Sequence, residues 1–136
     1  MAAGNYSFTI EQGSTTDFEI VYKDSNGNPI DLTGYDARMQ LKDSIGGSST
    51  FLTLSSSLGG DGTGLNLSGS GGLGASKPTT SGSIGIFVGY ETSSVLSFSS
   101  AVYDLELVSG SGNTAVVTRL LQGKVNLSKE VTSGSY

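Results

Sequence analysis

The sequence has no cysteine, no histidine and no tryptophan, and only two prolines among its 136 residues. Without cysteine no disulfide can form, so packing or binding partners must stabilise the fold. Without histidine or cysteine, the common nucleophile systems based on these residues and the usual zinc sites cannot be built. We therefore expect a protein that is not an enzyme, with no catalytic residue, no cofactor and no metal ion.

Charged residues are also few, at 14% of the chain, and the formal net charge is −5. The seven basic residues are scattered along the sequence, so neither nucleic acid nor a membrane surface is an expected partner. No apolar run approaches the ~20 residues that span a bilayer. Residues 1–5 lack the basic and apolar segments of a signal peptide, so we expect no secretion by a signal of its own.

Apolar and polar residues alternate in many short segments, which is the period of a strand with one buried face. Strands are predicted over residues 5–11, 17–23, 37–42, 51–54, 83–88, 101–108, 114–121 and 124–131. Gly123 separates the last two, and Thr92-Ser93-Ser94 is typical of a cap before a single helical turn. Seven or eight strands at this spacing predict an all-β sandwich that occupies residues 1–136 as one domain.

Residues 55–83 form a long stretch rich in glycine and serine, with a few leucines as its apolar residues. This segment is longer than the usual connection between strands, so we predict a loop or arm inserted in the domain. It is either a contact arm or a mobile loop, with a short strand around residues 65–67 as one ordered part.

Three patterns have the outline of a ligand or catalytic site but lack the required context. Residues 69–74 match the glycine spacing of a dinucleotide-binding turn, yet no strand and helix flank them. Residues 24–31 are rich in side-chain oxygens like a calcium loop, but Asn26-Gly27 is typical of a hairpin turn. Asp104 and Glu106 share the polar face of one predicted strand, and we interpret them as ordinary solvation of an exposed sheet.

Several runs combine into the pattern of a known family. They are residues 8–13 (FTIEQG), 24–35 (DSNGNPIDLTGY), 37–40 (ARMQ), 102–107 (VYDLEL), 120–123 (LLQG) and 130–132 (EVT). Together they resemble the immunoglobulin-like N-terminal domain of phage upper baseplate proteins, over nearly the whole chain apart from about residues 44–81. The resemblance implies an immunoglobulin-like antiparallel β-sandwich.

In that family the domain docks onto other virion proteins and positions the parts that carry adhesins. The resemblance thus implies a structural protein of a tailed-phage virion, assembled in the host cytoplasm and present in many copies in a symmetric assembly. The family member that names the domain continues into a helical, adhesin-carrying region, whereas this sequence ends at Tyr136. We therefore expect an adaptor of the tail or baseplate. A capsid decoration protein is the alternative within this class. A host-glycan-binding module is an alternative of another class, disfavoured by the absence of tryptophan.

Six residues are predicted to contact partner proteins. They are Tyr6, Leu65, Leu67, Leu73, Tyr90 and Tyr136. The leucines are the apolar anchors of the glycine-rich segment, and the tyrosines lie near chain ends or loops, where tyrosine is favoured at interface hot spots. For Tyr6 and Tyr90, a place at the edge of the core is an equally good interpretation.

Overall fold

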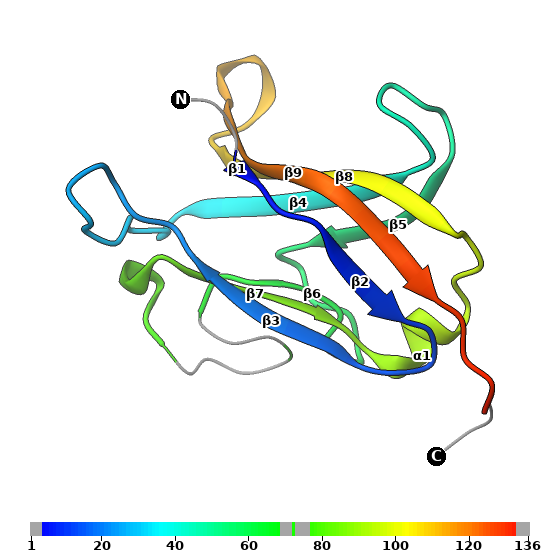
Figure 1. The fold of residues 1–136 in the computed structure, drawn as a ribbon. Coiled ribbons are helices and arrows are strands. Elements are labelled where there is room, and N and C mark those ends of the chain that lie inside the picture. Colours follow the sequence, from blue (N-terminus) through cyan, green and yellow to red (C-terminus); the bar gives the residue numbers. More distant parts are fainter. Residues whose placement is uncertain (1–3, 69–71, 73–76, 133–136) are drawn as a thin grey trace.

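The alternating sequence forms two β-sheets packed face to face in a computed structural model, which describes residues 4–68, 72 and 77–132 (Figure 1). The larger sheet contains β1 (Gly4–Asn5), β2 (Phe8–Glu11), β4 (Tyr35–Lys42), β5 (Thr50–Ser55), β8 (Ser100–Ser109) and β9 (Val116–Ser128). The smaller sheet contains β3 (Thr16–Val21), β6 (Gly64–Asn66) and β7 (Ser83–Val88). The helical segments are α1 (Tyr90–Ser94) and the 3-10 turns η1 (Thr79–Ser81) and η2 (Gly112–Thr114). The predicted all-β sandwich is confirmed.

The strand order corresponds to that of an immunoglobulin sandwich. The larger sheet runs β1-β9-β8-β4-β5 with β2 also on β9, and the smaller sheet runs β3-β7-β6. In the immunoglobulin scheme, β3, β7 and β6 take the places of strands B, E and D, and β9, β8, β4 and β5 those of G, F, C and C′. The start of the chain departs from this scheme, because β1 and β2 both pair in parallel with β9. No described strand therefore takes the place of strand A beside β3.

The core lies between the two sheets and is built from the inward faces predicted by the alternation. The antiparallel strands β4 and β8 place Met39 opposite Leu105 and Leu41 opposite Tyr103. All four side chains are buried, and Ile86 of the smaller sheet is buried in the same cluster. Burying an aliphatic side chain of this size stabilises a fold by ~1.5–3 kcal/mol. In the part of the chain that the structure describes, no helix is long and apolar enough to cross a membrane.

The predicted break at Gly123 is wrong, because β9 is one strand from Val116 to Ser128. A Cβ on Gly123 would collide with the backbone carbonyl of Tyr6, where the connection between β1 and β2 runs alongside β9. The glycine therefore serves a close approach of two backbones and not a turn. The irregularity in this strand lies earlier, where Leu120 has no partner in β8.

The predicted helical turn is present but begins before its predicted cap. α1 starts after Gly89, which makes no side-chain cap hydrogen bond, so the Thr92-Ser93-Ser94 run lies inside the helix. Ser93 has a different role, since it is fully buried. Its Oγ donates to the carbonyl of Ser14 at 2.8 Å and accepts from the amide of Gly13 at 3.1 Å. Ser93 thus fastens the β2–β3 turn to α1.

The glycine-rich segment 55–83 is attached to the smaller sheet at several points. It contains β6, which confirms the short strand predicted near its middle and pairs antiparallel with β7. After β6, the side-chain Nδ2 of Asn66 donates to the carbonyl of Gly72 at 2.8 Å. Further on, Lys77 Nζ donates to Glu19 Oε1 of β3 at 2.7 Å. These contacts bring the described parts of the segment back onto the sandwich, in contrast to a free arm.

Candidate functional site on the outer face of the larger sheet

Outward side chains in the middle of β4, β8 and β9 form a polar surface on the larger sheet. Their register aligns them in three rows across the three strands. The rows are Lys42, Val102 and Lys124; then Gln40, Asp104 and Gln122; then Arg38, Glu106 and Arg119. We call these nine residues the polar face. They line a half-open groove of about 720 Å³, which the loop between β4 and β5 borders.

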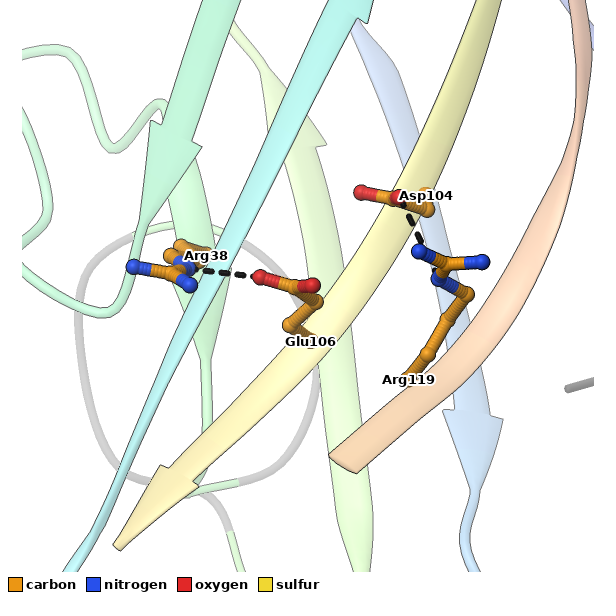
Figure 2. A network of polar contacts seen from close by, with 4 residues as sticks. All are labelled: Arg38, Asp104, Glu106 and Arg119. Carbon is orange, nitrogen blue, oxygen red and sulfur yellow. Dashed lines mark hydrogen bonds and ion pairs between the residues drawn. The ribbon is translucent and has the colours of Figure 1, made fainter. Parts of the chain in front are cut away.

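Two arginines reach across the polar face to the carboxylates of the central strand β8. Arg38 Nε of β4 lies 2.7 Å from Glu106 Oε1, and Arg119 Nε of β9 lies 3.4 Å from Asp104 Oδ2. Figure 2 shows the two pairs side by side, one approaching β8 from each neighbouring strand. Exposed ion pairs of this kind contribute at most ~1 kcal/mol each to stability.

The polar face differs in charge from the rest of the molecule. Four basic residues, Arg38, Lys42, Arg119 and Lys124, line the groove together with only two acidic ones. The remainder of the sequence has three basic and ten acidic residues. The lining of this groove thus has an excess of positive charge on an otherwise acidic chain, which favours an acidic partner surface at that place.

In the oxygen-rich run 24–31, the side-chain oxygens of two aspartates accept hydrogen bonds from nearby backbone amides. Gly27 has φ of 83°, as the predicted Asn-Gly turn requires, and Asp24 Oδ1 accepts from the amides of Asn26 and Asn28 at 2.9 Å each. Hydrogen bonds from the side chain and backbone of Thr33 lower the pKa of Asp31. Within residues 4–68, 72 and 77–132, no group of three acidic residues lies close enough together to hold a metal ion. Most of the glycine pattern of residues 69–74 lies outside the described residues.

Tyr103 is the aromatic residue among those that line the groove, and its ring belongs to the core. Its side chain points inward, where the hydroxyl donates to the backbone carbonyl of Tyr6 at 2.5 Å. Burial, with a smaller contribution from Tyr6, raises the pKa of Tyr103 to about 12. The polar face therefore presents no aromatic platform, among its described residues, on which a sugar ring could stack.

None of the four predicted contact residues that the structure describes lines the groove of the polar face. Leu65 is 0% exposed in the core, so the prediction that it contacts a partner is wrong: β6 pairs with β7, and this side chain packs in the core cluster. Leu67 is partly buried against the same core. Leu73 and Tyr136 lie outside the described residues.

The two remaining candidates are accessible. Tyr6 is 46% exposed, and its ring centroid lies 5.7 Å from that of Phe18. Tyr90 is half-buried at the start of α1, and its hydroxyl lies 3.3 Å from a carboxylate oxygen of Glu91. Partner contacts by these tyrosines stay a prediction.

Sequence reasoning missed the basic residues of the polar face because they are scattered in the chain. A signal was present locally, since the alternation over residues 37–42 already puts Arg38, Gln40 and Lys42 on one side of a strand. Their convergence with Arg119 and Lys124 depends on the register of three strands that lie far apart in sequence.

No protein-family model matches the chain, and no curated protein is found to be similar to it. Among solved structures, the N-terminal domain of phage TP901-1 ORF48 is similar with a TM-score of 0.48 and 10% sequence identity. The similar region covers 94% of this chain and 91% of that chain. A similarity of this degree assigns no function, which has to be inferred from the site itself.

Proposed function

We propose that this chain is a structural protein of a tailed-phage virion that docks onto other virion proteins through its polar face, as an adaptor of the tail or baseplate. The observation that carries the docking role is the open face with a basic excess on an otherwise acidic chain. The assignment to a phage virion is supported by the resemblance of residues 24–35 and 102–107 to upper baseplate proteins.

The shape and lining of the groove favour a protein partner over a small molecule. Sites for small molecules have few polar groups, whereas six of the residues that line this half-open groove are charged. Ile45, in the loop between β4 and β5, also lines the groove and is 93% exposed. An exposed isoleucine beside a polar surface offers apolar area for burial when a partner covers the face.

The lysines of the polar face are the groups best placed to test docking. Lys42 and Lys124 form no ion pair among the described residues, so their reversal leaves the two arginine–carboxylate pairs intact. We therefore compare Lys42→Glu/Lys124→Glu with Lys23→Glu/Lys129→Glu, which makes the same charge change away from the polar face.

The assay adds each purified variant to virions that lack the protein and measures bound copies by quantitative mass spectrometry. We expect the polar-face variant to bind at least about tenfold more weakly than wild type, a loss of ~1.4 kcal/mol. The control variant should bind like wild type. Equal weakening by both variants would contradict docking through the polar face, and circular dichroism checks that both variants are folded.

The location within the virion is tested separately. Heads and tails are separated from purified particles and analysed by mass spectrometry, and we expect the protein in the tail fraction. Recovery in heads alone would contradict the adaptor role and favour capsid decoration, and absence from virions would contradict the virion assignment.

A further inference from the structure

Strand β3 (Thr16–Val21) is an edge strand over its whole length. It pairs with β7 on one side, and no described strand pairs with its other side. The amide of Tyr22, just after β3, donates to the carbonyl of Gly82, just before β7, at 2.8 Å. The backbone groups of Tyr22, and of every second residue before it, therefore point toward β7. In an antiparallel pair these groups alternate between the two sides of a strand. Asp17, Glu19 and Val21 therefore direct their N–H and C=O groups to the open side.

This open edge follows from the altered start of the chain. In an immunoglobulin sandwich the first strand pairs with the strand that β3 represents. Here β1 and β2 pair with β9 in the other sheet, so the edge of β3 is left uncovered by them. A six-residue strand is ~20 Å long, which is enough for an added strand to form a ladder along it.

Aromatic side chains lie next to this edge, in the gap between β2 and β3. The ring centroids of Phe8 and Phe18 are 5.0 Å apart, and those of Tyr6 and Phe18 are 5.7 Å apart. All three rings are partly exposed. A strand added to β3 would place every second side chain over these rings and so bury apolar surface as well as form main-chain hydrogen bonds.

The acidic residues of β3 determine which strand fits. Antiparallel pairing of β3 with a second copy of itself sets Glu19 against Glu19 when it is centred on that residue, and Asp17 against Glu19 when it is centred on Phe18. Like charges directly opposite each other destabilise a strand pair. Asp17 is exposed and forms no ion pair among the described residues, whereas Glu19 is paired with Lys77. The matching strand therefore carries a basic residue opposite Asp17.

We propose that β3 accepts an extended segment of another protein as an added strand, with basic residues on its outer side and apolar residues facing the aromatic rings. This proposal depends only on the β3 edge, so it stands or fails independently of the polar face and of the phage assignment.

The test uses a seven-residue probe peptide that alternates valine and lysine, with blocked ends, at millimolar concentration. Backbone amide exchange is followed by NMR in the free and peptide-bound protein. In the free protein the amides of Asp17, Glu19 and Val21 should exchange quickly, and those of Phe18 and Ile20 slowly. With the probe, the first three should slow at least about tenfold, because each then donates to the added strand.

Two methylated probes make the test specific for strand addition. One probe carries N-methyl groups on all its lysines and the other on all its valines. An added strand pairs with β3 through the N–H groups of one of these two residue types only, so exactly one of the two methylated probes should fail to slow the three amides. For antiparallel addition it is the probe with methylated lysines. Asp17→Lys should weaken probe binding, whereas the control Asp43→Lys in the loop after β4 should not. The proposal is overturned if the three amides are already protected in the free protein, if no probe slows them, or if both methylated probes act alike.

Discussion

Replacement of Gly123 by alanine tests a close approach of two backbones. The added Cβ would collide with the carbonyl group of Tyr6, which belongs to the backbone and cannot rotate away like a flexible side chain. The chain between β1 and β2 must therefore move off β9. Three hydrogen bonds hold it there: Tyr6 N to Gln122 O at 3.0 Å, Tyr103 Oη to Tyr6 O at 2.5 Å, and Lys124 N to Ser7 Oγ at 3.2 Å.

The expected loss of stability follows from these three hydrogen bonds. Each contributes ~1 kcal/mol net, and a buried hydroxyl left without a partner adds ~1–3 kcal/mol. The gain from restricting the unfolded chain when glycine becomes alanine is at most ~1 kcal/mol. We therefore expect Gly123→Ala to lower the free energy of unfolding by ~3–5 kcal/mol, out of a total of ~5–15 kcal/mol for a typical domain.

Urea denaturation followed by circular dichroism measures this change. Gly60→Ala is the matched control, because nothing lies within 4 Å of its added Cβ, and we expect its stability to stay within ~0.5 kcal/mol of wild type. If the effect acts through the Tyr103 hydroxyl, the costs of Gly123→Ala and Tyr103→Phe should be less than additive in the double variant. A change below ~0.5 kcal/mol for Gly123→Ala would refute the steric reasoning.

Three further predictions concern single side chains. Tyr103→Phe should cost ~1 kcal/mol at neutral pH by leaving the Tyr6 carbonyl unpaired. Because burial raises the pKa of Tyr103 from 10.0 to about 12, the folded state holds this proton more tightly than the unfolded chain. Wild type should therefore lose its advantage over Tyr103→Phe as the pH rises from 10.0 to about 12, which urea titrations across that range would show; an unchanged difference contradicts it. Leu65→Ala should lower the free energy of unfolding by ~2–5 kcal/mol, because this side chain is fully buried. An unchanged free energy of unfolding would contradict the burial of Leu65. Ser93→Ala should cost ~1–3 kcal/mol by thermal denaturation, since two backbone groups of the β2–β3 turn lose their partner. Ser94→Ala, at an exposed neighbour, serves as its control and should cost less.

The alternation of apolar and polar residues predicted the strands of the core because this pattern depends only on residues within one strand. In β8, Tyr103 and Leu105 face the core and Asp104 faces solvent, as the period of two requires. The turn at Gly27 was predictable for a similar reason, since Asn-Gly suits a positive φ whatever the neighbouring strands do.

The failed predictions concern residues whose environment comes from distant parts of the chain. Gly123 resembles a turn residue until the β1–β2 connection is known to run directly alongside β9 at this position. Leu65 resembles an isolated apolar anchor in a loop until β6 is paired with β7 and its side chain faces the core. Short segments have too little local pattern to reveal contacts of this kind.

The sequence by itself determined that the chain is all-β, where most strands and turns lie, and which side of each strand is apolar, because these depend on near neighbours. The tertiary structure alone decided the parallel pairing of β1 and β2 with β9, the polar face and the open edge of β3. Each of these depends on the register and order of strands separated by many residues, and nothing in the spacing of residues along the chain specifies that order.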